Sequence, residues 1–250
     1  YNLGGSIMNA AVGALFLALY FICPNGSRTA PFVLLFAAVG FITAVMNGVP
    51  MRLGAVDNDG YNALAISKSS EAAEAFWVQL SIVGQSARGV RLKDMPEEWF
   101  RVPAEESMQN SIVAVRGVLA CNRLMDEQKF NQADALMARM LAAESGMAGI
   151  HRGLLVCDRM YIELIGAARR EAIEAMLTKA QTKFMKSMRR YPSVLRTEYA
   201  LALLLEKNAA RAEGIRAEFE KAAKSYPYPQ ETESERELIC LALNKSRGRA

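Results

Sequence analysis

The sequence predicts an all-α protein in which a two-span membrane hairpin precedes a soluble, helical-repeat-like domain. Residues 1–56 contain two long apolar runs and only two charged side chains, Arg28 and Arg52. From Asp57 onward the chain is polar, and amphipathic stretches of about 15 to 20 residues recur between Gly, Pro or polar breaks. We therefore expect a transmembrane hairpin over 1–62, a helical connector over 63–103 and a cytoplasmic helical domain over 104–250.

Each apolar run has the length of a membrane span. Residues 3–23 and 32–50 are uncharged, and about 20 apolar residues cross a hydrocarbon core as a helix. The turn "PNGSRTAP" joins them. The alternative is a buried hairpin in a soluble protein, but two such runs without one acidic residue favour the membrane.

The basic residues near the spans indicate their orientation. The turn carries only Arg28, whereas five basic residues follow the second span: Arg52, Lys68, Arg88, Arg91 and Lys93. Cytoplasmic flanks are enriched in Lys and Arg, so we expect a multi-pass membrane protein whose C-terminal domain is cytoplasmic. Membrane lipids are the first expected partner.

Cysteine use indicates the redox compartment of the protein, and net charge argues against one class of partner. The four cysteines are scattered without a C-x-x-C pair; they are Cys23, Cys121, Cys157 and Cys240. The last three lie in apolar helical patterns, which favours buried thiols in a reducing compartment. The net charge of +4 is too small to indicate nucleic acid as a partner.

Polar and helix-breaking residues mark both spans. Asn9 lies one helical turn after Gly5, and small residues such as Gly5 and Ser6 allow another backbone to come close. Asn47 and Pro50 break the second span near its end, and Asp59 follows shortly after. An ionisable group beside the membrane is a functional candidate. Two interpretations stay open: a metal ligand, or a juxtamembrane loop with an Asx turn at "DNDG".

These residues resemble the C-terminal half of the membrane core in the site-2 protease family, the intramembrane zinc metalloproteases. Gly5 to Asn9 matches the family's Gly-x-x-x-Asn element, Asn47 to Pro50 matches its Asn-x-x-Pro element, and Asp59 begins its Asp-Gly pair. The resemblance covers about the first quarter of the chain. It implies that Asp59 is one ligand of a catalytic zinc ion, while Asn9, Asn47 and Pro50 bind substrate or support the site.

Two features depart from the family's pattern. The interval from Asn47 to Asp59 is longer than usual, with a small insertion in "MRLGAVDN", so Asp57 is an alternative ligand. The H-E-x-x-H segment, which supplies two imidazole ligands and the general base, is absent. The single histidine, His151, lies far downstream. We therefore expect the other ligands upstream of Tyr1 in a longer protein, and no activity from this chain alone.

The rest of the chain has helical periodicity. We expect helices near 63–88, 105–125, 131–144, 150–165, 171–191, 195–206, 209–225 and 230–243. Residues 127–146 and 199–229 resemble arms of tetratricopeptide repeats, whose stacked helix pairs leave a concave face for partners.

Two functions follow. The first is the C-terminal part of a membrane-embedded zinc metalloprotease that hydrolyses a peptide or membrane-protein substrate. Its helical domain would recruit substrate or regulate access. The second is a non-enzymatic, membrane-anchored helical scaffold that binds protein partners.

Overall fold

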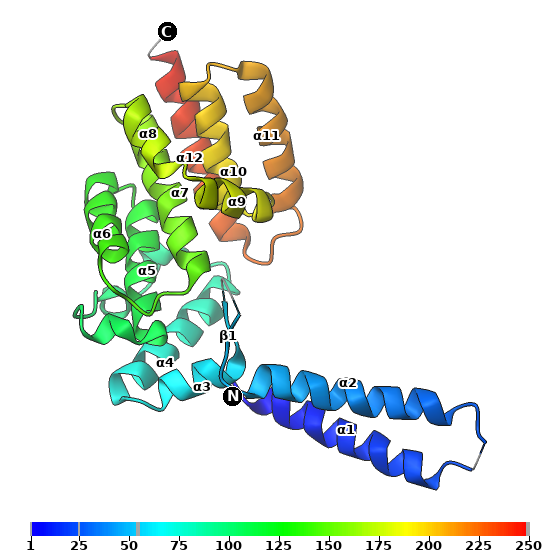
Figure 1. The fold of residues 1–250 in the computed structure, drawn as a ribbon. Coiled ribbons are helices and arrows are strands. Elements are labelled where there is room, and N and C mark those ends of the chain that lie inside the picture. The colour runs from blue at the N-terminus through cyan, green and yellow to red at the C-terminus, as the bar shows by residue number, and fades with distance from the viewer. Residues whose placement is uncertain (1, 25, 54–55, 249–250) are drawn as a thin grey trace. The chain divides into compact units, whose positions relative to one another are not determined.

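The chain folds almost entirely into helices. The structure, a computed structural model, describes residues 2–24, 26–53 and 56–248. These residues form twelve α-helices and one two-stranded ladder (Figure 1), which confirms the predicted helical character. Asn25, in the expected turn, and residues 54–55, in the expected insertion, lie outside the described residues. The chain divides into two compact units, Tyr1–Ala73 and Glu74–Ala250.

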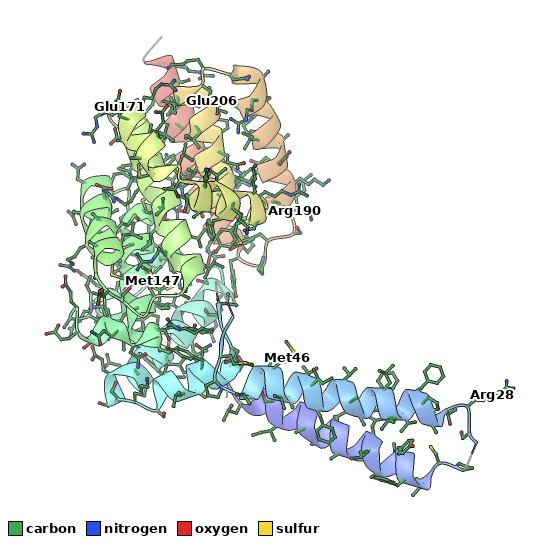
Figure 2. The ribbon with its side chains drawn as sticks, in the orientation of Figure 1. Arg28, Met46, Met147, Glu171, Arg190 and Glu206 are labelled. Atoms are coloured by element: carbon green, nitrogen blue, oxygen red, sulfur yellow. The ribbon has the colours of Figure 1, made fainter. Side chains whose placement is uncertain are left out.

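The first unit is built on an antiparallel hairpin of two apolar helices. Helices α1 (Gly4–Ile22) and α2 (Ala30–Gly48) have 19 residues each, about 28 Å of helix, close to the thickness of a hydrocarbon core. Both are long and apolar enough to cross a membrane. Only 11% and 6% of their most apolar windows are buried, whereas the core helix of a soluble protein is mostly buried. Figure 2 shows their side chains, with Arg28 at the connection and Met46 at the opposite end of α2.

Small residues bring α1 and α2 into backbone contact. A Cβ atom added to Gly40 would lie 2.9 Å from the Cα of Gly13, and one added to Gly48 would lie 3.2 Å from the Cβ of Ser6. Ser6 is buried, whereas Gly5 is exposed and has nothing within 4 Å of an added Cβ. The expected close packing therefore occurs within the hairpin at Ser6, as predicted, and at Gly13, but not at Gly5.

A short antiparallel ladder follows the hairpin. Strands β1 (Arg52–Leu53) and β2 (Val56–Asp57) pair with Arg52 opposite Asp57. Helix α3 (Asp59–Ile66) follows directly.

The second unit is a bundle of α-helices, with three short 3₁₀ segments between its first two helices. Its elements are α4 (Ser70–Ser86, which begins in the first unit), 3₁₀ turns at Leu92–Asp94, Glu97–Phe100 and Ser107–Gln109, α5 (Ser111–Asp126), α6 (Phe130–Ala142), α7 (Gly149–Ile165), α8 (Arg170–Met176), α9 (Lys179–Ser187), α10 (Pro192–Ala200), α11 (Ala209–Ala223) and α12 (Pro229–Arg247). A π-helical turn, Leu201–Leu205, extends α10. Helix α10 packs against α7, α11 and α12. A tetratricopeptide repeat is not confirmed.

Two of the helices expected as continuous are each divided by a capping side chain. The stretch 63–88 is divided between α3 and α4, where the Ser69 hydroxyl accepts a hydrogen bond from the Ala72 amide at 3.1 Å. The stretch 171–191 is divided between α8 and α9, where Thr178 accepts from the Gln181 amide at 3.1 Å. A capping hydroxyl satisfies an amide that has no carbonyl partner in its helix, and so starts a new helix.

A buried arginine links three helices of the second unit. Arg196 on α10 is fully buried. It forms ion pairs with Asp158 on α7 and with Glu235 on α12, the latter at 2.9 Å between Nε and Oε2. Its guanidinium carbon lies 4.4 Å from the ring centroid of Tyr161, whose hydroxyl donates to the Leu238 carbonyl at 2.8 Å. Buried charges are tolerated when they are paired in this way.

Two of the three cysteines that were expected to be buried are buried in the structure. Cys121 and Cys157 are buried, and burial raises the pKa of each thiol to about 12, so both remain protonated and unreactive. Cys240 was expected to be buried but is exposed, because it lies on the outer face of α12. Cys23 is half-buried.

Candidate functional site

The predicted break in the second span lies at the end of α2. Asn47 occupies the last turn, and α2 ends at Gly48, after which Val49 has extended backbone angles of φ −77° and ψ 126°. Pro50 follows and is exposed. A proline disfavours helical geometry in the residue before it and has no amide to continue the helix, so the Asn-x-x-Pro sequence terminates α2 as expected.

Asn58 holds the turn between α2 and α3 together. Its side chain is buried, with 7% of the residue exposed. The amide nitrogen donates to the carbonyls of Met46 at 2.7 Å and Val49 at 2.6 Å. The amide oxygen accepts from the backbone amides of Met51 at 3.0 Å and Tyr61 at 2.9 Å. One side chain thus caps the C-terminal end of α2 and the N-terminal end of α3.

Sequence reasoning named the two aspartates beside Asn58 and did not assign a role to Asn58 itself. The available signal was an Asx turn at "DNDG" immediately before a helix, since Asn is a preferred N-cap residue. In the structure Asn58 is the N-cap of α3, and its side chain accepts from the Tyr61 amide three residues on. This cap orients the helix that Asp59 begins and is compatible with the ligand interpretation of Asp59.

Gly60 places the first turn of α3 against the last turn of α2. A Cβ atom added to Gly60 would lie 2.2 Å from the Gly48 carbonyl oxygen, so only glycine allows this approach. Gly48 in turn contacts Ser6 of α1. The contact brings Asn47 and Asp59, the residues just before Gly48 and Gly60, to the same end of the hairpin.

The two candidate aspartates have different surroundings. Asp57 forms an ion pair with Arg52 at 3.2 Å, and its side chain is only 8% exposed. Asp59 is half-buried at the first position of α3. Within the described part of the chain, no hydrogen bond or ion pair reaches the Asp59 carboxylate. The Asn58 cap and the Gly60 contact set the backbone position of Asp59, so its carboxylate is positioned and is open to a further group.

The remaining candidate, Asn9, lies in the second turn of α1 and is half-buried. Its carbonyl oxygen would lie 3.0 Å from a Cβ added to Gly40. Asn9 therefore lies about one helical turn further along the hairpin than Ser6, which contacts Gly48. The structure gathers Asn47, Pro50 and Asp59 in one turn and places Asn9 deeper in the hairpin.

The part of the chain that the structure describes shows one candidate zinc ligand and no complete ligand set. Among the described residues, no group of three or more His, Cys, Asp or Glu side chains could hold a metal ion. His151 lies in the first turn of α7, in the second unit. A catalytic zinc takes three protein ligands, and Asp59 offers one.

Comparisons of the chain with protein-family models, with curated proteins and with solved structures find no match. The geometry of the turn and the motif resemblance are therefore the indications of function that this chain offers.

Proposed function

We propose that this chain is the C-terminal part of a membrane-embedded zinc metalloprotease of the site-2 protease kind, in which Asp59 supplies one zinc ligand. The observation that carries the proposal is the placement of Asp59. Its helix is capped by Asn58 and packed through Gly60 onto the end of an apolar helix, yet its carboxylate has no partner among the described residues. A fixed ligand position of this kind reduces the conformational freedom lost on binding an ion.

The proposal requires donors from outside residues 1–250. A lone carboxylate does not hold a catalytic zinc ion, so an H-E-x-x-H helix elsewhere in the protein would supply the other ligands. The role of this chain is then to position Asp59. Asn47 and Pro50, which belong to the same turn, would support the site or contact an extended substrate, and Asn9 would do so from within the hairpin.

The membrane placement supports this function. Helices α1 and α2 would span the bilayer with Arg28 outside and the helical unit in the cytoplasm, following the distribution of basic residues. The helical unit would recruit a membrane-associated substrate or regulate its access.

Two experiments test the protease proposal. Sequencing the coding region upstream of Tyr1 should reveal H-E-x-x-H on a further apolar helix. In that full-length protein, Asp59→Ala should abolish chelator-sensitive cleavage while membrane insertion persists. Asp57→Ala is the matched control, because Asp57 is already paired with Arg52, and it should retain cleavage. The reverse result would assign the ligand role to Asp57.

A membrane-anchored scaffold is the second candidate. Its support is an exposed apolar face on α4, where Trp77 is 58%, Leu80 41% and Val83 49% exposed. Contiguous exposed apolar residues often mark a binding surface for a protein. An intact upstream region without H-E-x-x-H, together with loss of partner binding in Trp77→Ser, would favour this function over the protease.

A further inference from the structure

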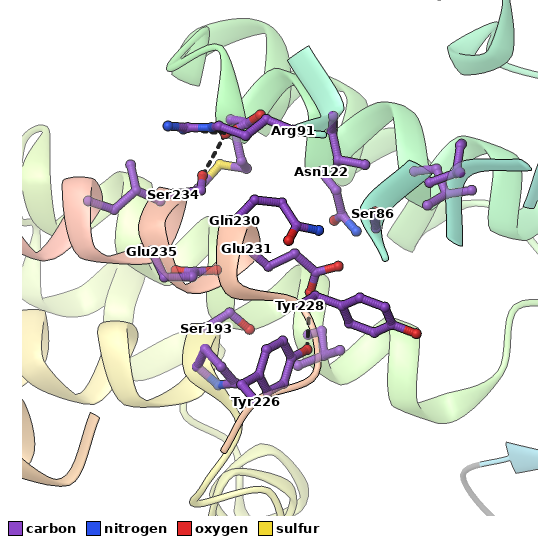
Figure 3. Close-up of a pocket in the computed structure, with 18 of the residues that line it drawn as sticks. Ser86, Arg91, Asn122, Ser193, Tyr226, Tyr228, Gln230, Glu231, Ser234 and Glu235 are labelled. Carbon is purple, nitrogen blue, oxygen red and sulfur yellow. Dashed lines mark hydrogen bonds and ion pairs between the residues drawn. The ribbon is translucent and has the colours of Figure 1, made fainter. Parts of the chain in front are cut away.

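The second unit contains a cavity that neither proposed function uses. Its volume is about 260 Å³, and its lining comes from the end of α4, from α5 and α7, and from the starts of α10 and α12 (Figure 3). Leu119, Leu154 and Leu238 are among the apolar residues of the lining, and Gln230 and Glu231 are among its polar residues. The combination of an apolar wall with a few converging polar groups is typical of a ligand site.

Gln230 gives the first indication of what the cavity binds. Only 5% of this residue is exposed, and neither its amide oxygen nor its amide nitrogen has a hydrogen-bond partner. Figure 3 shows its side chain in the middle of the cavity, between Asn122 and Glu231. A buried amide without partners is costly, so a ligand that hydrogen-bonds to it would gain affinity.

The charges of the lining give the second indication. Of the four acidic side chains in the lining, three contact an arginine: Asp126 pairs with Arg91, and Asp158 and Glu235 pair with Arg196. Glu231 is the exception.

Within the described residues, the recorded partner of the Glu231 carboxylate is the hydroxyl of Tyr226, which donates to it at 3.1 Å. Burial raises the pKa of Glu231, as expected for a carboxylate removed from water without a cation. A bound cation would offset this desolvation.

Tyrosine rings form the side of the cavity next to Glu231. Tyr226 lies 6.1 Å from Tyr191 and 6.1 Å from Tyr228, measured between ring centroids, in edge-to-face geometry. Aromatic faces attract ammonium and guanidinium groups. The aromatic rings and the Glu231 carboxylate, which has no cation partner among the described residues, thus both favour a positively charged ligand.

We propose that this cavity binds an organic cation, a primary ammonium or guanidinium on a short apolar stem. The positive group lies beside Glu231 and donates to the Gln230 amide oxygen, and the stem packs against Leu119 and Leu238. The volume has room for about eight non-hydrogen atoms. The cation comes either from a free amine or from a Lys or Arg side chain of a peptide. This inference is independent of the protease proposal.

The test uses the whole chain in nanodiscs of zwitterionic lipid, with empty nanodiscs as the blank. n-Pentylammonium and n-butylguanidinium are titrated calorimetrically against n-pentanol, a neutral molecule of similar size. We expect the cations to bind at least tenfold more tightly than the alcohol. Glu231→Gln should weaken their binding at least tenfold, whereas Glu233→Gln, an exposed residue on the same helix, should leave it unchanged.

A second variant is used if the first one misfolds. If Glu231→Gln alters the thermal melt, binding is measured with Gln230→Leu instead, because it removes the unpartnered amide without changing the charge and should also weaken binding. Cations that bind no better than pentanol overturn the proposal, as does wild-type affinity in whichever variant is folded.

Two peptides that differ by one residue, lysine or norleucine, identify the source of the cation. Tighter binding of the lysine peptide than of pentylammonium indicates a peptide ligand. Binding of the free amine alone indicates a small molecule, and failure of both contradicts the proposal.

Discussion

Replacing Asn58 with alanine removes four hydrogen bonds at once from the turn that carries Asp59. Two carbonyls at the end of α2 and two backbone amides lose their partner. Each such bond contributes about 1 kcal/mol net, which gives about 4 kcal/mol if the bonds are additive. Because the turn is only part-buried, water replaces some of them, and we expect the turn to lose about 2–4 kcal/mol of stability.

Amide hydrogen exchange measures this loss at the affected groups. A loss of 2–4 kcal/mol corresponds to exchange about 30- to 1000-fold faster for the Met51 and Tyr61 amides. Exchange in the middle of α2 should not change. Asn62→Ala is the matched control, since Asn62 lies on the same helix and its side chain has no recorded hydrogen bond in the described part of the chain.

A second substitution distinguishes the hydrogen bonds that the Asn58 side chain accepts from those that it donates. Asn58→Asp keeps the oxygen that caps α3 but replaces the donating nitrogen with an oxygen facing the Met46 and Val49 carbonyls. We expect it to destabilise the turn about as much as alanine does. Exchange at wild-type rates in both Asn58 variants would refute the interpretation that this side chain holds α2 and α3 together.

Three further predictions concern the packing and charges of both units. Gly60→Ala should cost about 1–3 kcal/mol of stability, because the added methyl group overlaps the end of α2, whereas Gly5→Ala should leave the thermal melt unchanged. Arg91→Met should cost about 3–5 kcal/mol, since it leaves a buried carboxylate unpaired, and the exposed Arg88→Met should cost nothing measurable. Burial raises the pKa of Glu235 to about 7, above its ordinary 4.5, so the folded state holds this proton more tightly than the unfolded state. The contribution of Glu235 to stability therefore falls as the pH rises from about 4.5 to about 7. Relative to wild type, Glu235→Gln should gain stability between about pH 5 and about pH 8. A difference in melting temperature between the two proteins that does not change with pH would contradict this.

Local sequence signals were sufficient for most of the helices. The two apolar runs predicted α1 and α2 to within two residues at each end, because uninterrupted apolar sequence bounded by Pro and Gly leaves few alternatives. The breaks at Ser69 and Thr178 were missed, since a hydroxyl within an amphipathic stretch fits either a helix face or a cap. Which one occurs depends on the packing of the two flanking segments.

The turn that carries the candidate residues was predicted in its position but not in its hydrogen bonding. Asn47, Pro50 and Asp59 are close together in sequence, and the turn joins them as expected. The role of Asn58 was not predicted, because two of its hydrogen bonds reach carbonyls 9 and 12 residues earlier in the chain. The sequence favoured Asp59 through its Asp-Gly pair and kept Asp57 as an alternative ligand, whereas the pairing of Asp57 with Arg52 follows from the strand register.

The sequence alone determined the helical class, the positions of two potential membrane spans and the break after Asn47, because each depends on residues within one or two helical turns. Tertiary structure alone decided which aspartate is free, why position 60 is glycine and where a carboxylate without a cation and a partnerless amide face one cavity of the second unit. These features depend on the pairing of β1 with β2, on the contact between α3 and α2, and on the packing of α12, which are fixed only when the elements come together.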